Sequence, residues 1–174
     1  MKKTKLINLF AGPGAGKSTI ASGLYYNLKS VGVCCDLPYE FPKQLVWEDS
    51  KNIIQDQLFV LANQHRGIVR SFGKTDFIIV DSPILLSLIY KDNYSQEYPS
   101  SLYGVKFDDM VIDMHKTYDC INFFLNRPET EYEDDGRYHS FSESKKIDTK
   151  IKTILNELNE RYINIDVNDK TVDK

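Results

Sequence analysis

A short glycine-rich segment near the beginning of the chain carries residue types that suit phosphate binding. It reads Ala11-Gly12-Pro13-Gly14-Ala15-Gly16-Lys17-Ser18-Thr19. Glycines let a backbone turn so tightly that successive N–H groups point into one hollow of anion size. In such loops the lysine reaches the outer phosphates of a nucleotide, and the hydroxyl after it is placed to bind Mg²⁺. We expect the nucleotide to contact a consecutive set of residues: Gly12, Pro13, Gly14, Ala15, Gly16, Lys17, Ser18 and Thr19.

One position departs from the usual pattern of this loop, which is a glycine, four residues and then Gly-Lys-Ser/Thr. Ala11 stands where the leading glycine is expected, and looser forms of the pattern allow such a small residue. The alternative interpretation is a glycine-rich turn that contains a lysine by chance. An apolar strand is predicted before the loop, and apolar residues with a spacing near 3.6 follow it. This context favours the nucleotide site.

An aspartate further along the chain is the second candidate for the chemistry. Asp81 follows Phe77-Ile78-Ile79-Val80, an apolar run rich in β-branched residues that predicts a buried strand. An aspartate at the carboxyl end of such a strand holds Mg²⁺ beside the loop serine in proteins with this loop. A buried strand that ends in Asp also arises by chance. Together with the loop, the pattern predicts Ser18 and Asp81 as metal-binding residues.

Two more carboxylates and two arginines are candidates for catalysis. Asp36 lies near the end of the expected second strand and Glu40 follows that strand, at the rim where open α/β sheets bind ligands. We prefer Glu40 as the group that orients or deprotonates an acceptor hydroxyl. Arg127 and Arg137 lie in a polar segment at about 126–142, which we interpret as a lid. Their side chains could meet phosphate charge, or each could pair with acidic neighbours as surface charge.

Alternating strands and helices must position these groups. Strands are predicted at 5–10, 33–37, 76–81, 120–125 and 162–167. Helices are predicted from near Ser18 to Val31, at 51–71, 85–89 and 107–114, and from Ser142 or Glu143 onward. Ser140 and Glu143 have the spacing of a capping box before that last helix. Two strands joined by a helix form a β-α-β unit, so we expect a parallel sheet covered on both faces, an α/β fold.

The composition limits the classes of function. A chain of 174 residues with 41% hydrophobic and 27% charged residues has room for one domain with a real core. A net charge of −3 gives no general attraction to nucleic acid or to an anionic membrane. We found no apolar run of about 18 residues and no signal peptide, so we expect a cytoplasmic protein. The tyrosine-rich segment 90–103 could stack on a base or cover the edge of the core, and both interpretations stay open.

Five stretches spread over nearly the whole chain form a recognisable set. They are Ala11 to Thr19, Glu40 to Glu48, Asp56-Gln57-Leu58 with Gln64-His65-Arg66, Asp81-Ser82-Pro83, and Asp135-Gly136-Arg137. This set resembles the P-loop nucleoside and nucleotide kinases. More closely, it is similar to small phage-encoded ATPase/kinase proteins related to the ribosylnicotinamide kinase domain. The first and fourth stretches are specific for nucleotide binding, and the others are looser.

The resemblance implies a fold, a donor and a class of acceptor. The fold would be a P-loop NTPase with three α/β/α layers, a five-stranded parallel sheet with the loop strand central, and one kinase domain over 1–174. ATP with Mg²⁺ would be the donor, the acceptor would lie near Glu40, and the lid would carry Arg137. Some phage relatives are thought to phosphorylate hydroxymethylated bases in DNA, such as 5-hydroxymethyluracil, whereas others act on nucleosides or nucleotides.

Two hypotheses of different classes remain after the resemblance. The first is an ATP-dependent and Mg²⁺-dependent phosphotransferase in the cytoplasm, or in the host cytoplasm if a phage encodes it, with a homo-oligomer allowed. The second is an ATP-hydrolysing switch or assembly factor that acts on a protein or DNA partner. A basic cluster in the last long helix could favour DNA, although such a cluster is more often a solvated face. It consists of Lys145, Lys146, Lys150 and Lys152.

Overall fold

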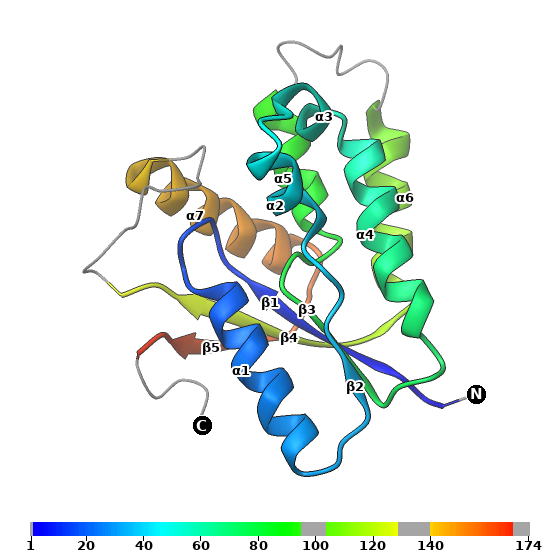
Figure 1. The fold of residues 1–174 in the computed structure, drawn as a ribbon. Helices are drawn as coiled ribbons and strands as arrows, with labels where there is room; N and C mark the ends of the chain where they lie inside the picture. The colour runs from blue at the N-terminus through cyan, green and yellow to red at the C-terminus, as the bar shows by residue number, and fades with distance from the viewer. Residues whose placement is uncertain (1, 95–103, 129–139, 169–174) are drawn as a thin grey trace.

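One sheet of five parallel strands runs through the centre of the molecule, in the order β2-β3-β1-β4-β5 (Figure 1). The structure is a computed structural model that describes residues 2–94, 104–128 and 140–168. The strands are β1 (Lys5–Phe10), β2 (Cys35–Asp36), β3 (Phe77–Val80), β4 (Asp119–Asn126) and β5 (Tyr162–Asp166). Because β1 pairs with both β3 and β4, the strand that feeds the glycine-rich loop is central, as expected.

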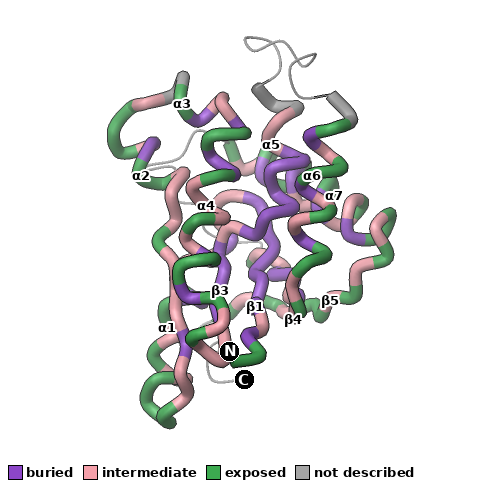
Figure 2. Tube along the Cα trace, turned by 90° about the vertical axis from the view of Figure 1, so that its right-hand side faces the viewer, coloured by how far each residue is buried: buried purple, intermediate pink, exposed green. Residues whose placement is uncertain are grey.

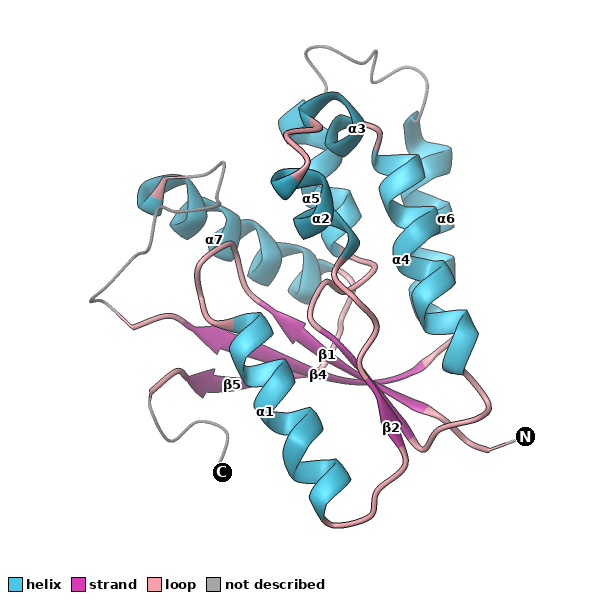
Figure 3. Cartoon of the chain, in the orientation of Figure 1, coloured by secondary structure: helices cyan, strands magenta, loops and turns pink. Residues whose placement is uncertain are grey.

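Helices cover both faces of this sheet (Figure 3). On one face, α1 (Lys17–Ser30) packs its Ile20 and Ala21 against Ile7 and Leu9 of β1. Side chains alternate along a strand, so Leu6 and Phe10 point to the opposite face. That face is covered by α4 (Gln57–Ser71), α5 (Leu86–Tyr94), α6 (Gly104–Lys116) and α7 (Phe141–Glu157). The predicted three-layer α/β/α fold is confirmed.

The register of the strands brings the predicted site residues to one edge of the sheet. Asn8 of β1 lies opposite Val80 of β3, so Asp81 follows β3 close to the point where β1 runs into the loop. Figure 2 shows that the buried residues are concentrated in the central strands and in α5. The carboxyl ends of parallel strands share one edge, where open α/β sheets bind ligands. The loop and Asp81 are therefore neighbours across the sheet.

The single long helix that we predicted at 51–71 is wrong. The chain forms α3 (Lys51–Gln55) and then α4, with a break at Asp56. Asp56 has φ −74° and ψ 81°, and its side chain accepts a hydrogen bond from the N–H of Phe59 at 3.0 Å. As the N-cap of α4, Asp56 gives the Phe59 N–H an acceptor at the start of the helix, where no carbonyl of that helix is available to it. Apolar periodicity runs through both helices and conceals the break.

Two other local predictions need correction. The polar stretch after β2, expected only as a rim, contains the helix α2 (Phe41–Trp47), with Pro42 in its first turn. Proline is tolerated there because its missing N–H has no partner in a helix. The second strand has only two residues instead of the predicted 33–37. The capping box is confirmed, since Ser140 and Glu143 satisfy each other's backbone N–H groups before α7.

Some predictions fall on residues that the structure does not describe. These residues are 95–103, most of the tyrosine-rich segment, and 129–139, most of the expected lid. Arg137 is among them, so its predicted position lies outside the described residues. Within the described ranges, no helix has both the length and the apolar character needed to cross a bilayer.

Candidate nucleotide-binding site

The glycine-rich loop joins the end of β1 to the first turn of α1. Gly14 and Gly16 adopt φ values of 79° and 82°, in the left-handed region that other residues rarely enter. Such residues between right-handed neighbours turn successive N–H groups toward one concave surface that attracts anions. Gly16 is also the N-cap of α1, so the positive end of that helix points at the same place. The local sequence therefore builds a phosphate-sized cradle.

Lys17 folds back over this loop. Its Nζ donates hydrogen bonds to the carbonyl oxygens of Ala11, at 2.8 Å, and Gly12, at 3.0 Å. Burial lowers the pKa of Lys17, and the negative charges of Glu40 and Asp81 oppose that shift. The ammonium group of this half-buried side chain is thus held by neutral carbonyl groups. A phosphate oxygen would offer it a full negative charge in the same place.

Ser18, Glu40 and Asp81 converge beside the lysine. The Ser18 Oγ donates a hydrogen bond to Glu40 Oε2 at 3.2 Å. Burial, and then the charge of Glu40, raise the pKa of Asp81 to about 6, whereas Lys17 and a hydrogen bond from Ser18 lower it. Asp81 is only 7% exposed. The Ser18 hydroxyl and the Asp81 carboxylate are oxygen donors of the kind that Mg²⁺ prefers, and a dication beside them would relieve the repulsion between Asp81 and Glu40. The predicted metal residues fit the ion.

Glu40 reaches this group from the start of α2. It occupies the N-cap position of that helix, with φ −72° and ψ 97°, but its side chain makes no capping hydrogen bond. The carboxylate extends to the loop serine instead. Asp36 ends β2 at the same edge of the sheet, and no hydrogen bond in the described part of the chain links it to Ser18, Glu40 or Asp81. The structure therefore brings one of the two candidate rim carboxylates to the loop serine.

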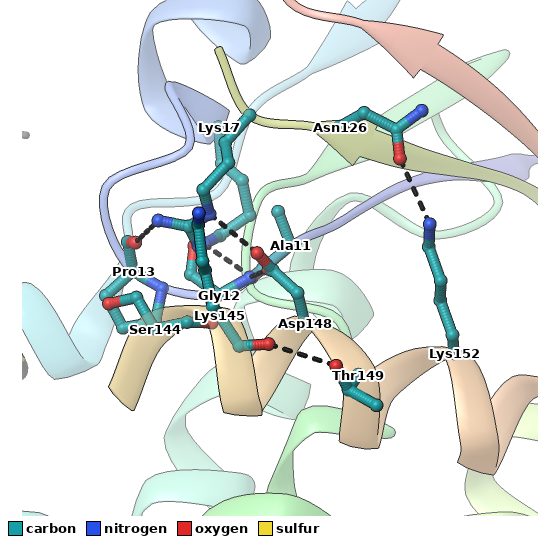
Figure 4. A network of polar contacts seen from close by, with 11 residues as sticks. Ala11, Gly12, Pro13, Lys17, Asn126, Ser144, Lys145, Asp148, Thr149 and Lys152 are labelled. Carbon is teal, nitrogen blue, oxygen red and sulfur yellow. Dashed lines mark hydrogen bonds and ion pairs between the residues drawn. The ribbon is translucent and has the colours of Figure 1, made fainter. Parts of the chain in front are cut away.

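Arg127 lies against the outer side of the loop. Its Nε donates to Asp148 Oδ2 at 2.6 Å, and its Nη1 donates to the carbonyl of Pro13 at 3.0 Å. The other Asp148 oxygen accepts the N–H of Gly12 at 2.6 Å. Figure 4 shows Asp148 on α7 directed at the loop, near Gly12 and Lys17. Arg127 is thus paired with an acidic residue, but that residue lies on a remote helix and not in the neighbouring acidic run.

Sequence reasoning missed two residues that support the site. Asp148 is one of the few acids in a lysine-rich helix and borders its apolar stripe, which is a weak signal at best. Gln64 of α4 stands in one of the looser stretches of the resemblance, and the sequence indicates no role for it. In the structure its Nε2 donates to Ser82 Oγ at 2.6 Å and so fixes the turn that carries Asp81. Both contacts join remote elements, which periodicity alone does not pair.

Comparison with known proteins finds solved structures that are similar to this chain and one family model that matches it. No curated protein matches the chain. Among solved structures, NadR protein in complex with NR is similar with a TM-score of 0.68 at 16% identity, over 96% of this chain and 47% of NadR, so the chain spans about half the length of that protein. Thymidylate kinase from Ehrlichia chaffeensis has a TM-score of 0.58 at 20% identity, over 95% of this chain and 88% of the kinase.

At these identities the two structures establish the fold alone: a three-layer α/β fold that a thymidylate kinase shares. The family assignment comes from the sequence. The model of the family AAA_28, described as an AAA domain, matches residues 6–170, a range that contains the loop, Asp81 and the whole of α7. Because this match extends over most of the 174 residues, the chain belongs to the AAA_28 family of AAA domains.

Proposed function

We propose that this protein is an ATP-dependent and Mg²⁺-dependent phosphotransferase. It would move the γ-phosphate to a hydroxyl or phosphate group of a nucleoside, a nucleotide or a hydroxymethylated base in DNA. The observation that carries this proposal is the meeting of Lys17, Ser18 and Asp81 at one edge of the sheet, with Glu40 beside them. We further propose that residues 1–174 act as one kinase domain in the cytoplasm.

The loop and its lysine would hold the triphosphate. The N–H groups of Gly14, Ala15 and Gly16 would be the donors of this cradle, because Gly14 and Gly16 have left-handed backbone angles. Lys17 would exchange its two carbonyl partners for phosphate oxygens and stabilise the charge that spreads over the transferring group. Bound Mg²⁺ would neutralise phosphate charge and fix the geometry of the phosphates. Ser18 and Asp81 are the residues that would hold it.

Glu40 would act on the acceptor. Ser18 would give up its hydrogen bond to Glu40 if its hydroxyl held Mg²⁺, and a Glu40 carboxylate oxygen would then be available. That oxygen can take the proton of an acceptor hydroxyl, whose oxygen then forms a bond to the γ-phosphorus while the bond to the departing ADP oxygen breaks. Asp36 remains the weaker candidate for this proton transfer. Arg137 would approach the transferring phosphate from the lid. Arg127 would meet phosphate charge from beside the loop.

The structural neighbours support a small acceptor. One is by name a thymidylate kinase, and the other was solved as NadR protein in complex with NR. Both contain the three-layer fold, so the edge of the sheet used here is compatible with phosphate transfer near a nucleoside-like ligand. The acceptor classes to test are therefore nucleosides and nucleoside monophosphates. DNA with hydroxymethylated bases is tested as well, because the sequence resemblance implies it.

A transfer assay with ATP labelled at the γ-phosphate tests the proposal. The protein is incubated with each acceptor class, and labelled acceptor and free phosphate are separated and counted. We expect label in one acceptor class, dependent on Mg²⁺ and lost in Lys17→Ala. The matched control is Lys29→Ala, an exposed lysine in the last turn of the same helix. Label that appears in no acceptor would contradict the proposal.

The alternative function is an ATP-hydrolysing switch or assembly factor. The same loop, lysine and metal residues would serve it, with water in place of the acceptor. The family description as an AAA domain is compatible with this alternative. In the assay it would appear as free phosphate released in the presence of every acceptor, with faster release when a protein or DNA partner is added.

A further inference from the structure

We propose that Asp148 is a positioning residue for the phosphate-binding loop. Its carboxylate would anchor the beginning of the loop to α7, directly through Gly12 and indirectly through Arg127. The inference deepens the proposed function, because it concerns the nucleotide site. Asp148 would touch neither the nucleotide nor the acceptor, and its effect would pass through the loop backbone.

The two oxygens of the carboxylate are divided between two partners. Oδ1 accepts the N–H of Gly12 at 2.6 Å, and Oδ2 accepts the Nε of Arg127 at 2.6 Å. The arginine then donates from Nη1 to the carbonyl of Pro13 at 3.0 Å. The carboxylate, the guanidinium group and the backbone from the Gly12 N–H to the Pro13 carbonyl therefore form a closed ring of contacts. This ring holds the two-residue stretch Gly12-Pro13 at both of its ends.

The direction of the Gly12 N–H assigns it to this anchor. A hydrogen bond of 2.6 Å to a charged carboxylate is a strong one, and it points the donor at α7. The N–H therefore does not contribute to the cradle made by the glycines that follow. Gly12, which the sequence predicts at the nucleotide, is better explained by its contact with α7.

The need for glycine at position 12 has the same origin. A Cβ placed there would lie 2.7 Å from the carbonyl oxygen of Ser144 and 3.0 Å from Asp148 Oδ1. Real Cβ atoms do not approach backbone oxygens to 2.7 Å, so a side chain would push the loop away from α7. Close approach of the backbone to a helix, and not an unusual φ, therefore selects glycine here.

Burial makes the anchor sensitive to charge. The Arg127 side chain is 7% exposed and that of Asp148 16%, so each charge depends on the other for compensation. The lysine of the site lies within reach of both charges. Burial is the main cause of the lowered pKa of Lys17, Asp148 opposes it and Arg127 adds to it. Loss of the carboxylate would leave an uncompensated cation beside the loop and release its first peptide unit.

The experiment compares Asp148→Ala and Asp148→Asn with the wild-type chain. The matched control is Thr149→Ala, at the exposed next residue of α7, whose hydroxyl donates within the described part of the chain to the Lys145 carbonyl of the same helix. Two readouts are taken: the Kd for Mg²⁺ with ATP by calorimetry, and hydrogen exchange at the Gly12 amide by NMR. The second readout needs neither nucleotide nor turnover.

We expect Asp148→Ala to weaken nucleotide binding by at least about tenfold and to speed exchange at Gly12 by a similar factor, since both partners lose their acceptor. Asp148→Asn keeps an oxygen for Gly12 but not the charge for Arg127. Its Gly12 amide should stay protected while nucleotide affinity falls. A double variant with Arg127→Ala should bind nucleotide no more weakly than Asp148→Ala alone, because the two residues act as one unit. Thr149→Ala should match the wild type.

The anchor would be overturned by a nucleotide affinity within about twofold of wild type in Asp148→Ala, or by faster exchange spread evenly over α7 and β4. The even spread would assign Asp148 a general structural role. If Asp148→Ala does not fold, Asp148→Asn tests the anchor. Its Gly12 amide should stay protected from exchange while its nucleotide affinity falls. A wild-type chain that takes up no nucleotide would refute the proposed function. Unchanged exchange at Gly12 in a folded Asp148→Ala would separately refute the anchor.

Discussion

The two sides of the phosphate-binding loop differ in how their charges are balanced. On one side, Glu40 and Asp81 are two carboxylates in contact with Ser18, and their repulsion helps to raise the pKa of Asp81. On the other side, Arg127 and Asp148 form a compensated pair at 2.6 Å. An uncompensated cluster of like charge is where a ligand of opposite charge gains most. The first side is therefore the one that we propose to bind the metal and to carry out the reaction, whereas the charges of the second side are already paired.

The largest effect is expected from the residue that lies between the two sides. Lys17→Ala removes the one ammonium group that the loop presents to the phosphates, so transfer should fall by about a thousandfold or more. The fold should persist, because the lysine bonds only to carbonyls of its own loop. Transfer rates and thermal melting check this, with Lys29→Ala as the control. Transfer at the wild-type rate would show that the lysine does not serve catalysis.

The reactive side is tested next by Glu40→Gln. The amide keeps the size of the side chain but cannot take a proton, so turnover should fall by about a hundredfold, within the usual range for general bases. ATP affinity should change much less. Glu48→Gln, at the exposed end of the same helix, is the control. Equal losses of kcat and of ATP affinity would contradict the role of Glu40 as the base for the acceptor. They would indicate instead that Glu40 acts at the metal.

The compensated side is broken by Arg127→Ala. This change leaves Asp148 buried without its cation, and loss of one partner of a buried pair typically costs about 3–5 kcal/mol of unfolding free energy. Denaturant unfolding measures the change, and Arg70→Ala on the exposed face of α4 is the control. A loss below about 0.5 kcal/mol, the range of ordinary surface substitutions, would mean that the pair is as weak as a solvated one.

The pH dependence of the free energy of unfolding tests the raised pKa of Asp81 on the side of the loop that carries Glu40. The folded pKa of Asp81, about 6, lies above its ordinary value of 3.8, so folding favours the neutral acid. The stability from this group is therefore present below pH 3.8 and lost as the pH rises through about 6. Without Mg²⁺ and nucleotide, Asp81→Asn should stabilise the protein at pH 7.5 by roughly 1–3 kcal/mol. At pH 5 the gain should be smaller.

Unfolding of the metal-free protein at both pH values tests this prediction. Asp76→Asn is the control, because Asp76 precedes the same strand and pairs with Lys2 at the surface. A gain for Asp81→Asn that is equal at the two pH values would contradict the raised pKa. Added Mg²⁺ should stabilise the wild type more than the variant.

The smallest effect is expected at the start of α7. Ser140→Ala removes half of the capping box and should cost about 1 kcal/mol of unfolding free energy. Because Asp148 lies two turns further along the helix, its contacts with the loop should persist and nucleotide affinity should stay within about twofold of wild type. A large loss of affinity in this variant would show that any weakening of α7 disturbs the loop. The anchor would then not be specific to Asp148.

Some of the site follows from local rules that a sequence expresses directly. Left-handed φ values at Gly14 and Gly16 need glycine, and Gly16 is at once the N-cap of α1. Asp81 follows a buried strand, and parallel strands end at one edge of a sheet, so its approach to the loop was predictable. The break at Asp56 was not, because apolar periodicity continues across it and the aspartate could have remained in a helix.

The sequence by itself determined the alternation of strands and helices, the phosphate cradle and the acid that faces it, because each depends on sterics and periodicity within a few residues. Tertiary structure alone decided that Glu40 reaches Ser18 and that Asp148 holds Gly12 from 136 positions away. Those contacts require α2 and α7 to pack at one particular place on the sheet. That placement depends on the fit of the whole core, which no local pattern encodes.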